Sequence, residues 1–156
     1  MNVITRRRKP SGRYTPLAER EKRNMQKIAF CGNDCFVCPR YIATQSGDVI
    51  RLKEVAELWN RLGWRDTVVS PEEIMCYGCS SSNFCRYGIQ RCASEKIVDN
   101  CGNCNDYPCD LTIRSIEQTQ MYVESIKEKC TEEEYQCLKI AFYFKQENLD
   151  RIRNRR

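Results

Sequence analysis

Cysteine is the residue type that could carry chemistry in this chain. The sequence has 156 residues, twelve cysteines and no histidine. Ten of the cysteines lie in one stretch that contains three C-x2-C pairs: Cys31, Cys35, Cys38, Cys76, Cys79, Cys85, Cys92, Cys101, Cys104 and Cys109. A C-x2-C pair places two thiolates at one edge of a tight turn, which is the arrangement that a tetrahedral metal site needs. We therefore predict that these ten cysteines are metal ligands.

Disulfides and redox-active or merely buried thiols are the other uses of so many cysteines. The chain starts with a basic run that no apolar segment follows, which is not the pattern of a secretory signal. This pattern predicts a cytoplasmic, prokaryotic protein, and disulfide frameworks belong to secreted chains. Metal ligation is therefore the favoured interpretation.

The number of cysteines predicts two zinc ions. Without histidine, each zinc site must be built from four cysteines, so two sites would use eight of the ten. The simplest pairing joins the 76–79 pair to the 101–104 pair. The 31–38 group would then need a fourth ligand. Spacing does not show which of three cysteines supplies it: Cys85, Cys92 or Cys109. Cations near these turns would offset the negative charge of the thiolates: Arg40, Arg86 and Arg91.

An iron–sulfur cluster is the alternative cofactor. The C-x3-C-x2-C spacing of the 31–38 group is the one with which radical-SAM enzymes bind a 4Fe-4S cluster. Those enzymes usually have an aromatic residue before the third cysteine, where this chain has Val37, and they need a large α/β barrel. A 4Fe-4S cluster for electron transfer or redox sensing stays open, because all-thiolate ligation suits zinc and iron–sulfur clusters equally.

The elements that must position these cysteines are predicted to be helices. Apolar residues recur at helical spacing through residues 48–63, and 90–98 has the pattern of a short helix between cysteine groups. Ser70 begins a helix-start signature. Two longer helices are expected at the end of the chain, over 110–129 and from the capping box at Thr131 to about residue 152. Strand patterns are nearly absent.

The predicted fold is mostly α: a small, irregular, metal-stabilised cysteine-rich domain with helices between ligand loops and a C-terminal helical pair. We divide it into a basic, partly flexible N-terminal arm (1–27), a cysteine-rich metal-binding domain (28–110) and a C-terminal helical pair (111–156) packed on that domain as one compact unit. A structural zinc contributes roughly 10–16 kcal/mol of apparent folding free energy. Loops too irregular to hold themselves together by packing need such a contribution.

Four residues outside the ligand set are predicted to be structural. Cys130 and Cys137 have no C-x2-C partner, which favours small buried residues over ligands. Trp59 is expected in the core, and Trp64, beyond the end of the same helix, at its partly exposed rim.

The positive charge of the chain sits at its two ends. Residues 1–27 carry nine Lys or Arg and two acidic residues, and residues 28–150 carry thirteen basic and nineteen acidic residues. A dense basic segment attracts phosphates without reading sequence, although a solvated tail has the same composition. We expect an unidentified protein partner, no membrane contact, and a weak nucleic-acid contact through the arm: Arg6, Arg7, Arg8, Lys9 and Arg13.

The cysteine motifs also follow a fixed order. CGNDCFVCP is followed by an aromatic residue, and CYGC, a Cys-Ala pair and CGNCNDYPC come later. Over about residues 30–115 this order resembles an uncharacterised family of bacteria and archaea, domain of unknown function 3795. Its members often have a further cysteine three residues after the one matching Cys85, where this chain has Gly88. The resemblance implies metal binding, usually assumed to be zinc, and supplies no activity.

Three functional classes follow. The absence of histidine removes histidine general acid–base catalysis and the Ser–His–Asp and Cys–His mechanisms, and no phosphate-binding glycine loop is present. A non-enzymatic zinc module that acts through partner contacts is favoured, because closed four-thiolate coordination leaves no position for substrate. An iron–sulfur protein is the first alternative. An enzyme with an open metal position is the second.

Overall fold

The computed structural model describes residues 27–79 and 85–156. Within these ranges, every element of regular secondary structure longer than an isolated bridge is a helix. The elements are α2 (Pro39–Ser46), α3 (Val49–Arg61), α4 (Pro71–Ile74), α5 (Ile89–Glu95), the 3-10 turn η2 (Cys101–Asn103), α6 (Asp110–Ser125), the 3-10 turn η3 (Lys127–Lys129), α7 (Glu132–Phe142) and α8 (Lys145–Arg153). Extended pairing in these ranges is limited to one isolated bridge between Ile28 and Asp34. The prediction of a small, mostly helical, cysteine-rich fold with a C-terminal helical pair is confirmed.

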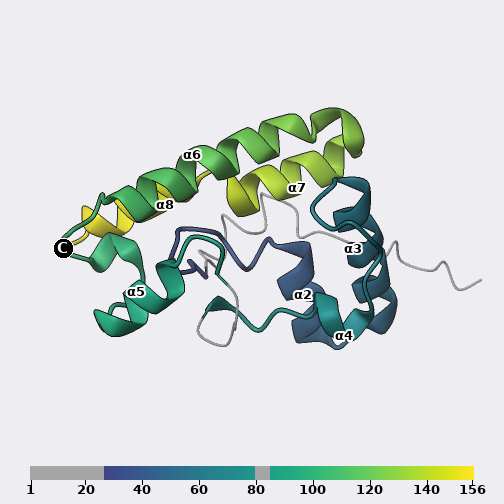
Figure 1. The fold of residues 1–156 in the computed structure, drawn as a ribbon, viewed down its shortest axis with the longest axis horizontal. Coiled ribbons are helices and arrows are strands. Elements are labelled where there is room, and N and C mark those ends of the chain that lie inside the picture. Colours follow the sequence, from purple (N-terminus) through teal and green to yellow (C-terminus); the bar gives the residue numbers. More distant parts are fainter. Residues whose placement is uncertain (1–26, 80–84) are drawn as a thin grey trace, which may run out of the picture.

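The long helix α6 runs along one side of the molecule, and α7 and α8 follow one another beside it (Figure 1). Helices α2, α3 and α4 gather at the α7 end, whereas α5 lies at the α8 end. Helices α2, α3 and α4 therefore lie toward one end of α6, and α5 lies toward the other end (Figure 1).

Local sequence explains where several helices begin. Asp48 caps α3 by accepting hydrogen bonds from the backbone of Ile50 and Arg51. Ser70 and Thr131 form the two predicted capping boxes, at the starts of α4 and α7. Each cap satisfies N–H groups that have no partner inside the helix. These starts confirm the predictions made from the sequence.

The predicted final helix over 131–152 is wrong as a single element, because α7 and α8 are separate. The carbonyl of Ala141 would accept the N–H of Lys145 in a continuous helix. It accepts instead the backbone N–H of Asp34, at 2.9 Å. Phe144 leaves helical geometry with φ −91° and ψ 33°, and α8 then packs on η2. The preceding predicted helix is also shorter than expected, since α6 ends at Ser125 and the 3-10 turn η3 follows it.

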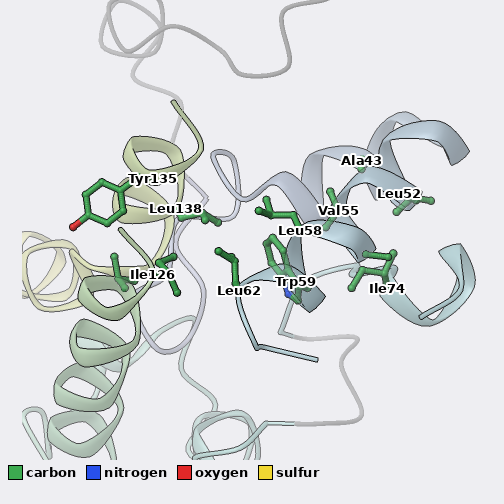
Figure 2. Close-up of a cluster of buried hydrophobic side chains, with 12 residues drawn as sticks. Ala43, Leu52, Val55, Leu58, Trp59, Leu62, Ile74, Ile126, Tyr135 and Leu138 are labelled. Atoms are coloured by element: carbon green, nitrogen blue, oxygen red, sulfur yellow. The ribbon is translucent and has the colours of Figure 1, made fainter. Parts of the chain in front are cut away.

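One hydrophobic core joins α2, α3 and α4 to α6 and α7 (Figure 2). It contains twelve buried residues and no cysteine among them: Ala43, Leu52, Val55, Ala56, Leu58, Trp59, Leu62, Ile74, Val123, Ile126, Tyr135 and Leu138. Trp59 is buried here and Trp64 packs against it half-exposed, as predicted. We call this cluster the thiol-free core.

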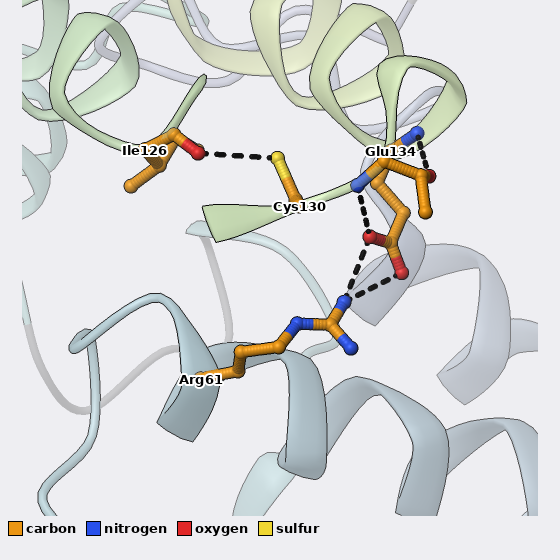
Figure 3. A network of polar contacts seen from close by, with 5 residues as sticks. Arg61, Ile126, Cys130 and Glu134 are labelled. Atoms are coloured by element: carbon orange, nitrogen blue, oxygen red, sulfur yellow. Dashed lines mark hydrogen bonds and ion pairs between the residues drawn. The ribbon is translucent and has the colours of Figure 1, made fainter. Parts of the chain in front are cut away.

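The junction of α3 and α7 carries polar contacts at its surface (Figure 3). Arg61 donates to both carboxylate oxygens of Glu134, at 2.8 and 2.7 Å. The half-buried Cys130 thiol donates to the carbonyl of Ile126 at 3.3 Å. Cys137 is buried, and its thiol donates to the carbonyl of Val37 at 3.1 Å. Cys137 is therefore buried, as the sequence predicts, whereas Cys130 is only half-buried.

Helix α8 approaches the cysteine loops so closely that two positions require glycine. A Cβ on Gly32, whose φ is +96°, would lie 2.5 Å from the carbonyl oxygen of Lys145. A Cβ on Gly102 would lie 2.6 Å from the carbonyl oxygen of Leu149. The Asn148 side chain adds a hydrogen bond of 2.9 Å to the carbonyl of Gly32. Helix α8 therefore fixes the turns that follow Cys31 and Cys101.

The basic residues of the predicted arm, Arg6 to Arg13, lie outside the described residues. In the ranges 27–79 and 85–156, no helix is long and apolar enough to cross a membrane.

Candidate metal centres

A first thiol group consists of five cysteines: Cys31, Cys35, Cys38, Cys76 and Cys79. Helix α2 brings its two halves together, because Arg40 donates hydrogen bonds to the carbonyls of Ile74 and Met75, the latter at 2.9 Å. Thr44, also on α2, accepts the backbone N–H of Cys76 at 2.9 Å. The chain leaving α4 is thereby held against the 31–38 loop. Four of these cysteines line one cavity, and the fifth, Cys31, is hydrogen-bonded to the Cys79 thiol.

A second thiol group consists of four cysteines: Cys92, Cys101, Cys104 and Cys109. All four line one cavity of about 290 Å³ between α5, η2 and the start of α6. The backbone N–H of Cys101 donates to the carbonyl of Phe30 at 2.9 Å, and Arg153 donates to the carbonyl of Cys104 at 2.6 Å. Cys109 is the N-cap residue of α6. Three elements and α8 therefore hold these thiols around a shared space.

This grouping corrects the pairing that spacing favours. The 76–79 pair lies with the 31–38 loop, and the 101–104 pair lies with Cys92 and Cys109. The reason is the return of the chain through α2, α3 and α4, which spacing along the sequence does not reveal. The tenth predicted ligand, Cys85, packs in the hydrophobic cluster that includes Cys31 and Cys101, between the two groups.

Burial and mutual repulsion dominate the electrostatics of these thiols. Burial, together with a smaller effect of neighbouring thiols, raises the pKa of Cys35 and of Cys101 to about 12. Burial also raises the pKa of Cys38, to about 11. Cys31 differs, because the hydrogen bond from Cys79 and the positive charge of Lys145 lower its pKa to about 5. Several thiolates in one group therefore require a compensating positive charge.

Lys145 is a buried cation that the sequence analysis missed. Its side chain donates to the hydroxyls of Ser115 and Thr119, at 2.7 and 2.8 Å. It also lies 5.1 Å from the centre of the Tyr87 ring. The residue is only 3% exposed. A lysine on a helix has no sequence signal that marks it as buried, because only the turn at Phe144 directs it inward.

The three cations predicted beside the thiols have different surroundings. Arg40 holds the loop that enters Cys76, as described above. The Arg86 guanidinium lies 5.4 Å from the centre of the Tyr122 ring. Arg91 is exposed and forms an ion pair with Glu95 at 3.7 Å. Arg91 therefore contributes little to the thiol groups.

The donor set of both groups fits zinc or an iron–sulfur cluster, since all the ligands would be thiolates. As the side chains of residues 27–79 and 85–156 are placed, no three Cys, Asp or Glu groups lie closely enough to hold a metal ion. Ion binding would require the sulfurs of a group to move toward one another.

The helices and the two thiol groups together define a small helical cysteine-rich protein. Its sequence matches the profile of a protein family of unknown function, DUF3795, over residues 27–114. The chain therefore belongs to this family, and the matched range contains all ten predicted cysteines. No curated protein and no solved structure gives a significant match to the chain.

Proposed function

We propose that this protein binds two zinc ions, one in each thiol group, and acts as a structural module that contacts a protein partner. The second thiol group carries the proposal. Four thiols from three separate elements line one cavity of about 290 Å³, which is the number of ligands that a closed structural zinc site uses.

The division of the core supports a structural role for the metal. The thiol-free core joins α2, α3 and α4 to α6 and α7 without cysteine among its buried members. The other two hydrophobic clusters contain cysteines of the two thiol groups. Thiols of both groups therefore take part in these two clusters, and bonds to a metal would add to the cohesion of the packed residues there.

Metal analysis of anaerobically purified protein tests the proposal. We expect two zinc ions per chain and an X-ray absorption spectrum with four sulfur ligands per zinc at about 2.3 Å. If the protein contained iron and absorbed visible light, the result would contradict zinc binding and favour the iron–sulfur alternative. A shell of nitrogen or oxygen ligands would contradict closed coordination and favour an enzyme with an open metal position.

Matched cysteine variants locate the ions. Cys104→Ser should lose one of the two zinc ions, because it removes a thiol of the second group. Cys130→Ser is the control, since Cys130 donates to the carbonyl of Ile126 in the helical region. Equal zinc content in both variants would contradict the assignment of the second group.

Chelation tests the structural role by hydrogen exchange. Removing zinc should expose the amides of α5 and η2 to exchange, whereas α3 and α7 stay protected by the thiol-free core. Unchanged protection of α5 after verified metal removal would contradict a structural role.

A further inference from the structure

The cavity that four cysteines of the first thiol group line is larger than the cavity of the second group. It measures about 720 Å³, within the range of roughly 300–1,000 Å³ that is usual for small-molecule sites. Its walls come from the 29–41 segment, the end of α3, the loop to Cys79, and parts of α6 and α7. Cys35, Cys38, the 76–79 pair and both tryptophans are among the lining residues.

The charged residues that line the cavity have one sign. The described lining contains four cationic side chains and no Asp or Glu: Arg40, Arg65, Arg86 and Lys129. Arg65, Arg86 and Lys129 are exposed; Arg65 also donates to the carbonyl of Trp64 at 3.1 Å, and the Arg86 guanidinium lies 5.4 Å from the Tyr122 ring centre. The Arg40 guanidinium already donates hydrogen bonds to the backbone carbonyls of Ile74 and Met75. Three exposed cations and no acidic residue in the described lining favour an anion.

Aromatic rings form the apolar part of the same cavity. Trp59 and Trp64 meet edge to face with their ring centres 5.0 Å apart. Phe142 lies 5.7 Å from Trp64, again edge to face. Tyr122, with the Arg86 guanidinium over its ring, lines the cavity as well. Such surfaces hold a flat ring by stacking and by edge contacts.

A buried polar atom in the lining has no partner. The side-chain oxygen of Asn33 is buried and accepts no hydrogen bond from the described residues. Buried polar groups nearly always have a hydrogen-bond partner, so this unpaired oxygen beside the cavity calls for an explanation, such as a bound water molecule.

We propose that this cavity binds a small organic anion with a planar ring system. The rings of Trp59, Trp64 and Phe142 would contact the flat part, and the exposed cations of the lining would pair with the anionic group. This inference goes beyond metal binding and does not depend on which metal the thiols hold.

The chain provides its own reporter for a test. It contains two tryptophans, and both line the cavity. The probe is 8-anilinonaphthalene-1-sulfonate, which combines planar rings with a sulfonate. N-phenyl-1-naphthylamine has the same rings without the charge. We expect energy transfer from tryptophan to the sulfonate probe at one saturable site, with affinity roughly ten-fold above that of the neutral probe.

A pair of double variants isolates the charge of the cavity. Arg65→Gln with Lys129→Gln should weaken the sulfonate probe roughly ten-fold and leave the neutral probe unchanged. Lys53→Gln with Arg114→Gln removes the same charge from exposed positions on α3 and α6 and should have little effect. Near-ultraviolet circular dichroism and metal content establish that each variant is folded and loaded.

Three results would each overturn the proposal. They are equal affinity for the two probes, equal weakening in the two double variants, and saturation without energy transfer from tryptophan. Zinc content is measured separately, so a protein that lacks zinc but passes these tests contradicts the metal proposal alone.

Discussion

The contact of α8 with the cysteine loops can be measured with three glycine variants. Gly47→Ala places a side chain at φ +63° with no atom within 4 Å of its Cβ. Gly102→Ala creates a contact of 2.6 Å with the carbonyl oxygen of Leu149, and Gly102 is not among the glycines with positive φ. Gly32→Ala combines both problems, with φ +96° and a contact of 2.5 Å with the carbonyl oxygen of Lys145. The three variants separate backbone strain from steric overlap.

The expected magnitudes follow from these two terms. A side chain in the left-handed region costs about 1–2 kcal/mol, which is the expected loss for Gly47→Ala. Overlap with a packed neighbour costs about 1–3 kcal/mol, which is the expected loss for Gly102→Ala. Gly32→Ala should lose about 3–4 kcal/mol, because its contact is with helix backbone that cannot rotate away.

Thermal unfolding of the metal-loaded protein is the assay. Since 1 kcal/mol corresponds to about 2–4 °C in a chain of this size, Gly32→Ala should lower the midpoint by roughly 10 °C and Gly47→Ala by roughly 4 °C. Equal losses in Gly32→Ala and Gly47→Ala would refute the close approach of α8. A neutral Gly102→Ala would refute it at η2.

The thiols, the buried lysine and the surface ion pair give three further predictions. Cys101→Ser should abolish binding of one metal ion, whereas Cys137→Ser should keep the full metal content and cost about 1 kcal/mol in urea unfolding, because the hydroxyl can still donate a hydrogen bond. Lys145→Met should lower the free energy of unfolding by about 1–3 kcal/mol and weaken metal retention against a competing chelator, since a buried positive charge is lost near the thiols. Arg61→Ala should cost no more than about 1 kcal/mol and lose that effect in high salt, because its ion pair with Glu134 is partly exposed; a larger, salt-independent loss would contradict this.

Elements set by local chemistry could be predicted from the sequence. The capping boxes at Ser70 and Thr131 require only residues three positions apart, and the apolar pattern of α3 repeats within its own thirteen residues. Such signals do not depend on the rest of the fold. Boundaries that depend on distant residues were missed, as at Phe144, where the N–H of Asp34 takes the carbonyl of Ala141.

The grouping of the thiols could not be predicted for the same reason. Spacing identifies the pairs 76–79 and 101–104 as units, but it does not say which other turn each unit meets. The 76–79 pair joins the 31–38 loop because Arg40 and Thr44 on α2 bind the backbone leading into it. No sequence motif identifies an arginine or a threonine that binds the backbone of a distant loop.

The position of the larger cavity bears on how a ligand would lie relative to the proposed metal. A closed four-thiolate centre has no open coordination position, so a ligand in this cavity would lie beside the first thiol group and not on its metal. The described lining offers cations and aromatic rings for binding. Recognition of an anion is therefore the chemistry that this surface supports best. In that case the metal would fix the wall of a binding site, and Cys35 and Cys38 would serve the ligand by holding that wall in place.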